Sequence, residues 1–300
     1  MTPTRTALTA VIACTASCLV ATVPASQART SSSRSALPGC RPAARFAAAH
    51  FPAHPVSHNR WLSLVPGTVT VLRGRAEGDD GKMHPHTIVS QVSRVTKFLD
   101  GVRTRVVFER DFQNGVLQES ELAFEAEDRR GRVWNVGEYP EQWSHHRLDG
   151  APDTWIAGLR HARAGLGMRA VPRVGTPAYL QGIAPAVEFH DCARVASFRH
   201  RLCLPARCFG HVLVIREWAP NDPEGGVQLK FYAHHVGAIR VGQLGGGSSA
   251  EELHVVHHAR LSAAALARVD RAVLRQDRRG YHVSPHLYGR TRHAQGHCAS

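Results

Sequence analysis

The clearest pattern in the chain is an alternation of apolar and polar residues over residues 101–138. In the first run the even positions are mostly apolar, and after Gln113-Asn114-Gly115 they remain so while glutamates occupy the odd positions: Val102, Val106, Phe108, Phe112, Val116, Leu122, Phe124 and Ala126 against Glu119, Glu121, Glu125 and Glu127. A period of two predicts two antiparallel strands with one buried face. We expect the acidic face to be solvated and offset by Arg103 and Arg105.

The register of this hairpin depends on the length of its loop. A two-residue loop would place Phe108 opposite Glu121 and mix the two faces. A three-residue loop over Gln113–Gly115 keeps the faces in agreement and supplies a glycine where a left-handed residue is needed. It pairs Phe112 with Val116, Val106 with Leu122, Thr104 with Phe124 and Arg103 with Glu125, and leaves Glu109 opposite Glu119. We therefore predict the three-residue loop.

Similar short runs continue through the chain and predict about ten strands: Thr68–Arg73, His86–Lys97, Val102–Phe112, Val116–Glu127, Val133–Glu138, Val187–Phe198, His211–Trp218, Val227–Tyr232, Gly237–Val241 and Leu253–His258. In the strand Val227–Tyr232 we expect Lys230 to point outward. The stretch Glu141–Pro185 is less regular and predicts a covering segment. After Ser262 the period changes to that of a helix. The fold class is mainly β, an antiparallel meander that forms a barrel or half-barrel with a C-terminal helix.

The ends of the chain differ in composition from its middle. Residues 1–28 have the apolar run and small-residue site of a secretory signal peptide, which predicts a secreted or envelope-associated protein. We assign residues 29–60 to a disordered lead-in, residues 61–260 to the β-barrel-like domain, residues 261–276 to the helix and residues 277–300 to a disordered basic tail. No stretch after the signal peptide predicts a transmembrane segment.

The net charge of +13 lies at the two ends, because residues 61–258 hold 23 basic and 22 acidic residues. This distribution argues against a specific nucleic-acid site and favours attraction of the ends to an anionic cell envelope. Outside the predicted signal peptide there are five cysteines: Cys40, Cys192, Cys203, Cys208 and Cys298. An oxidising exterior permits disulfides, and two of Cys192, Cys203 and Cys208 are expected to bridge.

Three motifs resemble a family of uncharacterised secreted actinobacterial proteins with PL-x-PGT, D-x-G-x-VW-x-x-GE and YYAPGVG patterns. They are Leu64-Val65-Pro66-Gly67-Thr68, the stretch from Asp128 to Trp134-Asn135-Val136-Gly137-Glu138, and Phe231-Tyr232-Ala233-His234-His235-Val236-Gly237. The chain is also distantly similar to lipocalin-like and lipoprotein-carrier barrels. The resemblance spans Leu62–Val256 and implies an extracytoplasmic β-barrel-like fold. His234-His235 departs from the third motif, and the family carries over no catalytic residue.

Common catalytic signatures are missing from the sequence, which has no G-x-S-x-G, P-loop or H-E-x-x-H motif. Among its 20 histidines, His254 and His258 are expected to share one strand face, and His234 or His235 would complete a three-ligand site for Zn or Cu. Solvated or hydrogen-bonded histidines on a sheet surface are the alternative. Glu217 is the one carboxylate in an apolar strand and is expected to face solvent or to pair with arginine.

Four aromatic residues, Phe108, Phe112, Phe124 and Trp134, fall on the apolar face of neighbouring predicted strands. They either fill the core or line a ligand pocket. We therefore expect a secreted, non-catalytic barrel that binds an apolar or amphipathic small molecule or an envelope component. The alternatives are a metal-binding protein or metal-dependent extracytoplasmic enzyme that uses the histidines, and a purely structural envelope protein.

Overall fold

The computed structural model describes residues 37–78, 80–244 and 250–296. The predicted signal peptide and Cys298 lie outside these residues. The strands in chain order are β1 (Thr68–Glu77), β2 (Met83–Leu99), β3 (Val102–Gln113), β4 (Val116–Glu127), β5 (Val133–Ser144), β6 (Arg147–Gly150), β7 (Trp155–Ile156), β8 (Arg163–Met168), β9 (Tyr179–Ala184), β10 (Phe189–Cys203), β11 (Cys208–Trp218), β12 (Val227–Ala233), β13 (Gly237–Leu244) and β14 (Glu251–Arg260).

Twelve of these strands form a closed antiparallel barrel. Strand β1 pairs with β14, and β4 pairs with β5, so the sheet has no free edge between its first and last members. The short strands β6 and β7 pair with β5 outside the ring. The predicted fold class is confirmed. The strand count was low because β8 and β9 lie in the stretch Glu141–Pro185, which we expected to be an irregular cover.

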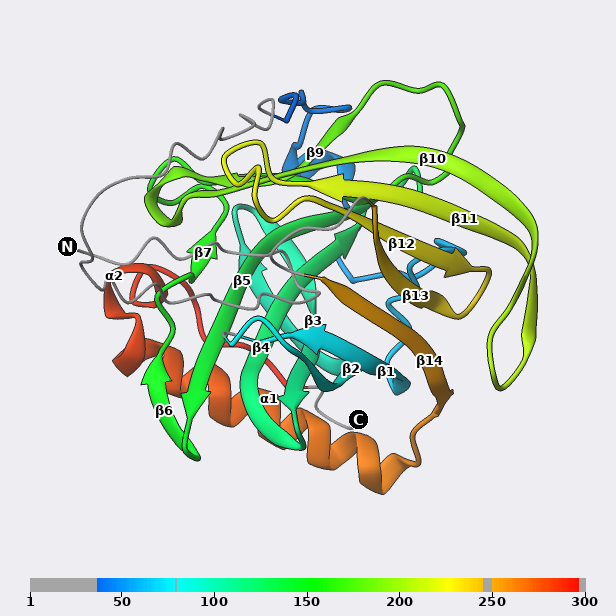
Figure 1. Ribbon diagram of the computed structural model, residues 1–300. Coiled ribbons are helices and arrows are strands. Elements are labelled where there is room, and N and C mark those ends of the chain that lie inside the picture. The colour runs from blue at the N-terminus through cyan, green and yellow to red at the C-terminus, as the bar shows by residue number, and fades with distance from the viewer. Residues whose placement is uncertain (1–36, 79, 245–249, 297–300) are drawn as a thin grey trace, which may run out of the picture.

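The C-terminal helix α1 (Ala263–Val283) lies along the outside of the barrel, below β2, β3 and β4 in the view of Figure 1. The Ser262 side chain accepts a hydrogen bond from the Ala265 amide, as expected of an N-cap. Val269 and Val273 are buried against the sheet. The helix passes its predicted end at residue 276, and α2 (Pro285–Tyr288) follows it. This part of the predicted disordered tail is therefore ordered, because it covers an apolar sheet face.

A buried ion pair fastens α1 to the barrel. The Lys97 ammonium, on β2, donates to the Asp277 carboxylate at 2.7 Å, and both side chains are at most 2 % exposed. The same ammonium donates to the Tyr281 hydroxyl and to the Arg292 carbonyl oxygen. It also lies 4.4 Å from the centroid of the Tyr288 ring. Together these contacts tie the chain after β14 to the wall of the barrel.

The N-terminal segment before β1 is ordered where the structure describes it, in contrast to the predicted disordered lead-in. Phe51 is buried, and the rings of Phe46 and Phe51 contact Trp134 on the outside of β5. A disulfide joins Cys40 to Cys192 on β10, a pairing that the cysteine spacing did not predict. The second disulfide, Cys203–Cys208, is of the expected kind. The covalent and apolar contacts hold this segment against the barrel.

The β3–β4 hairpin has a two-residue turn and a bulge in place of the predicted three-residue loop. Asn114 and Gly115 both have positive φ, which suits the tight turn, and Gln113 pairs with Val116. The register then shifts between Asp111 and Phe112. Beyond the shift Glu109 lies opposite Glu121, and Arg105 lies opposite Glu125. The bulge places apolar residues of β3 opposite apolar residues of β4, and acidic residues opposite acidic ones. The prediction had obtained the same matching of faces with a longer loop.

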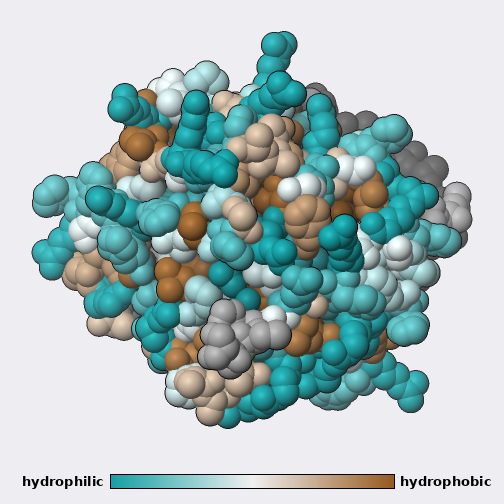
Figure 2. All heavy atoms as spheres, turned by 180° about the vertical axis from the view of Figure 1, so that it is seen from behind, coloured by the Kyte–Doolittle hydropathy of each residue, from teal (hydrophilic) through white to brown (hydrophobic). Residues whose placement is uncertain are grey.

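The two faces of this hairpin point in the directions opposite to those expected. Val107, Glu109, Ala123 and Glu125 line an internal cavity of the barrel. The alternating apolar residues, among them Leu122 and Phe124, belong to a core that also contains residues of α1 and α2. The acidic face is therefore inside the barrel, and the expectation that it is solvated at the surface is wrong. On the side of the molecule shown in Figure 2, hydrophobic residues are scattered among a majority of hydrophilic ones.

Candidate functional site

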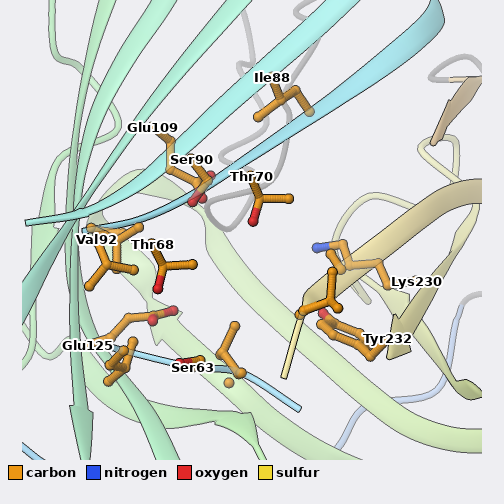
Figure 3. A pocket seen from close by; sticks show the side chains of 18 of the residues that line it. Ser63, Thr68, Thr70, Ile88, Ser90, Val92, Glu109, Glu125, Lys230 and Tyr232 are labelled. Carbon is orange, nitrogen blue, oxygen red and sulfur yellow. The ribbon is translucent and has the colours of Figure 1, made fainter. Parts of the chain in front are cut away.

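The barrel contains a cavity of about 120 Å³, which we call the lumen. Its wall combines aliphatic, hydroxyl and charged side chains from strands on all sides, and residues 62–64 of the N-terminal segment contribute to it: Leu62, Ser63, Leu64, Thr68, Thr70, Leu72, Ile88, Ser90, Val92, Val107, Glu109, Ala123, Glu125, Asn135, Gly167, Gln181, Glu217, Lys230, Tyr232, Val236, Gly237 and Ala238. In Figure 3, Glu109, Ser90 and Glu125 lie on one side, and Lys230 and Tyr232 lie on the other. The lumen is therefore amphipathic.

An unusual number of carboxyl groups face this interior. Because directly opposed residues of antiparallel strands share a face, Glu121 lies on the face of Glu109, and Glu119 lies on the face of Asp111. Glu138 is opposite the lumen residue Ala123. Glu217 also lines the lumen, and Glu251 lies 3.6 Å from His86. The set comprises Glu109, Asp111, Glu119, Glu121, Glu125, Glu138, Glu217 and Glu251.

Burial makes the ionised form of several of these groups unfavourable. It raises the pKa of Glu109 to about 7, although a hydrogen bond with Ser90 opposes the shift. Burial, with the charges of Glu109 and Glu138, raises the pKa of Glu125 to about 8. The pKa values of Glu119 and Glu121 are raised well above the ordinary range, first by burial and then by neighbouring carboxylates. Near neutral pH the carboxyl groups of Glu109 and Glu125 are therefore partly protonated and partly ionised.

A three-residue chain crosses the other side of the lumen. The Lys230 ammonium lies 2.5 Å from the Glu217 carboxylate. The Gln181 amide nitrogen donates to the other oxygen of Glu217 at 3.0 Å. Glu217, for which the sequence favoured solvent or an arginine partner, is thus buried with a lysine. Lys230, predicted to point outward, lines the lumen, because β12 presents its charged face inward as the β3–β4 hairpin does.

The raised pKa values predict that stability falls as pH rises. A glutamate with a folded-state pKa above its ordinary 4.5 binds more protons in the folded than in the unfolded chain between those two values. Each such group then lowers the free energy of unfolding by up to about 1.4 kcal/mol per pH unit in that window. We expect urea unfolding to show the highest stability near about pH 5 and a decline towards about pH 8.

A matched pair of variants tests this expectation. Glu125→Gln should flatten the decline, because the amide does not ionise. Glu252→Gln, which removes a 73 % exposed carboxylate from β14, should leave the slope unchanged. A stability that rises from pH 5 to pH 8 in the unmodified protein would contradict the prediction.

The four aromatic residues predicted to bind a ligand do not line the lumen. Phe124 and Trp134 are fully buried on the outer face of the sheet, beneath α1 and the N-terminal segment. Phe108 alternates with the lumen residues Val107 and Glu109, and so points outward. Phe108 and Phe112 lie beside the Arg110 guanidinium, at 5.3 and 5.8 Å from their ring centroids. The structure places them in the outer layer, where they serve packing.

The histidines predicted to bind metal do not converge. The β1–β14 pairing shifts between Val71 and Leu72, which turns His254 and His258 to opposite faces of β14. The His258 ring shares a hydrogen bond with the Thr70 hydroxyl, and the centroid of the His234 ring lies 4.0 Å from that of Trp61, with the two rings tilted by 50°. In the described ranges, the only trio of histidine, cysteine or acidic ligand atoms close enough for a metal ion is Cys40, His190 and Cys192, and its two cysteines are joined by the disulfide.

Comparisons with known proteins identify no family for the chain. No protein-family model matches it, and no curated protein matches it. Two solved structures are similar over 67 % of the chain: a putative exported protein with a YmcC-like fold from Bacteroides fragilis (12 % identity, all of that chain, TM-score 0.31) and a putative lipoprotein from Parabacteroides distasonis (11 % identity, 99 % of that chain, TM-score 0.27). Neither likeness assigns an activity. The resemblance to secreted actinobacterial proteins stays a prediction.

Proposed function

We propose that the protein is an extracytoplasmic, non-catalytic barrel that binds a small amphipathic molecule in its lumen. The observation that carries this proposal is the cavity of about 120 Å³ inside the barrel, whose wall contains both aliphatic and polar side chains. A cavity of only about 10–15 Å³ holds one water molecule, so the lumen has room for several waters or for a small organic group. Proteins bind small molecules in mostly apolar pockets with a few placed polar groups.

The disulfides support the extracytoplasmic part of the proposal. Two disulfides are present in the described residues, and such bonds persist mainly in oxidising compartments. None of the helices in the described residues combines the length and apolarity of a membrane span. The disulfides agree with the secreted or envelope-associated location that the sequence predicts.

The predicted attraction to an anionic envelope also has support in α1. Both acids of this helix, Asp270 and Asp277, are buried and pair with residues of the barrel. The exposed face instead carries four arginines at helical spacing: Arg268, Arg271, Arg275 and Arg278. A one-sided cationic helix face is attracted to polyanionic surfaces. An anionic envelope therefore stays our proposed partner for the exterior of the barrel.

A cavity-filling variant tests the binding function. We expect benzyl alcohol, a small amphipathic probe, to bind the tag-free protein in ligand-observed NMR. Ala123→Leu adds side-chain volume at a lumen-lining position and should abolish this signal. Ala264→Leu adds the same volume on the exposed side of α1 and should preserve it. Absence of probe binding, together with no co-purified molecule in native mass spectrometry, would overturn the proposal.

The metal-dependent alternative is tested on the same preparation. Metal analysis of the tag-free protein is expected to show less than one equivalent of Zn or Cu. A full equivalent that disappears in His254→Ala would favour the metal-binding alternative instead.

A further inference from the structure

We propose that the molecule bound in the lumen is an organic cation, a small amine with an apolar body. This inference rests on the proposed binding function and specifies its ligand. The ammonium group would lie among the carboxyl groups of β3 and β4, centred on Glu109, Glu121 and Glu125. The apolar body would contact the aliphatic side chains of the lumen wall.

Charge balance is the first argument. Lys230 and His86 face the acids of the lumen, but both are already engaged. Lys230 pairs with Glu217, and the His86 imidazole lies 2.9 Å from Asp111. Within residues 37–78, 80–244 and 250–296, four further glutamates form no ion pair with a basic side chain: Glu109, Glu119, Glu121 and Glu125. The lumen therefore contains more acidic side chains than the basic side chains around it pair with.

Arg105 does not fill this gap. It lies opposite Glu125 in the β3–β4 register. Its guanidinium, however, donates to the carbonyl oxygen of Arg94 on β2 at 2.9 Å. Glu125 accordingly retains a raised pKa, caused by burial and by the neighbouring carboxylates. The register alone would suggest an ion pair that the side chains do not make.

Unused hydrogen-bond acceptors are the second argument. Glu121 is 3 % exposed, and one oxygen of its carboxyl group has no hydrogen-bond partner. Gln181 is 4 % exposed and lines the lumen, and its amide oxygen is also without a partner, since the amide nitrogen is held by Glu217. Buried acceptors are costly when they are left unpaired. An ammonium group supplies three donors and would satisfy the Glu121 oxygen, which lies on the side of the lumen where the cation is placed.

The spread of the acids favours an organic cation over a metal ion. A single metal ion needs several ligand atoms close together. In the described part of the chain, no three carboxylates of the lumen bring oxygens within 4.8 Å of one another. A substituted ammonium group is larger and binds through separate hydrogen bonds. Aliphatic side chains also line the lumen beside the acids, among them Leu72, Ile88, Val92 and Val107, and they would contact the apolar body of such a ligand.

Proton linkage gives the inference a second readout. Glu109 and Glu125 are partly protonated at neutral pH, and a bound cation would favour their ionised forms. Binding should therefore release protons and strengthen as pH rises from about 6 to about 8. The charged and titratable groups that face these two carboxyls are Lys230, Asp111, Glu119, Glu121, Glu138, Glu217, Glu251, His86 and Tyr232.

Calorimetry with three probes of similar shape tests the inference: benzylamine, benzyl alcohol and benzoate. Charge-assisted hydrogen bonds contribute about 1.5–3 kcal/mol, so benzylamine should bind at least about tenfold more tightly than benzyl alcohol, and benzoate more weakly than either. Glu109→Gln and Glu125→Gln should each weaken benzylamine binding by about tenfold and change benzyl alcohol binding by less than about twofold. The exposed control Glu252→Gln should change neither.

The outcomes separate this inference from the proposed function. Equal affinities for benzylamine and benzyl alcohol, unaffected by either lumen substitution, would overturn the cation inference and leave the binding function standing. Tighter binding of benzoate, or an amine affinity that falls as pH rises, would also overturn it. Failure of all three probes to bind the unmodified protein would overturn both.

Discussion

Asp277→Ala is expected to lower the free energy of unfolding by about 3–5 kcal/mol, because it leaves the Lys97 ammonium without its counter-ion inside the protein. The lysine side chain is 0 % exposed, and the aspartate is its only ion-pair partner in the described residues. The remaining contacts, to the Tyr281 hydroxyl and the Arg292 carbonyl oxygen, are dipoles and do not neutralise the charge. Burial already lowers the pKa of Lys97, so deprotonation limits the loss. Urea unfolding followed by tryptophan fluorescence measures the change.

A second acid on the same helix face provides the control. Asp270 pairs with Arg94, whose side chain is 34 % exposed, so solvent screens this pair. Asp270→Ala should therefore cost clearly less than Asp277→Ala. The double substitution Lys97→Met with Asp277→Leu replaces both charges by apolar groups and should recover much of the loss. Equal losses of stability for the two single variants would show that burial does not make the Lys97–Asp277 pair more important for folding than the Arg94–Asp270 pair.

Removal of the Cys40–Cys192 disulfide is the second large effect that we expect. The bond closes a loop of 152 residues, for which the chain-entropy relation gives about 5 kcal/mol at room temperature. It also holds the N-terminal segment, which covers Trp134 and contributes three residues to the wall of the lumen. We expect the double variant Cys40→Ser, Cys192→Ser to unfold at a much lower urea concentration.

The other disulfide allows the loop length to be tested separately. Cys203 and Cys208 are 5 residues apart, and the same relation gives about 2 kcal/mol for their bond. The double variant Cys203→Ser, Cys208→Ser should thus lose less than half as much stability. If the two double variants lose the same amount, constraint of the unfolded chain is not the main contribution of the longer bond.

The alternation along the sequence predicted strands correctly but could not say which face of them points inward. Leu122 and Phe124 need burial, and a barrel offers it either in the lumen or beneath an outer layer. The answer depends on α1 and the N-terminal segment, which are distant in sequence and supply that outer layer. The same ambiguity misled the prediction for β12, in which Lys230 and Tyr232, and not their neighbours, line the lumen.

Bulges account for the remaining errors of register. The two-residue turn and the shift near Asp111 together move the cross-strand partner of Glu109 from the predicted Glu119 to Glu121, and the shift at Val71 separates His254 from His258. A single extra residue reverses every later side chain of a strand, and no turn residue marks these positions. The Glu217–Lys230 pair was missed for another reason: each residue was noted singly, and only the β11–β12 register brings them together.

The outward direction of the apolar sheet face has a consequence for the order in which the protein can be completed. All twelve strands of the ring precede α1 in the chain, so a nascent molecule that has every strand still lacks the element that covers β2, β3 and β4. Until the helix emerges, a broad apolar surface remains open to other chains. The barrel is therefore expected to be prone to aggregation until α1 has been synthesised and covers this surface. A truncation that removes α1 should be far more damaging than the distance of this helix from the lumen suggests.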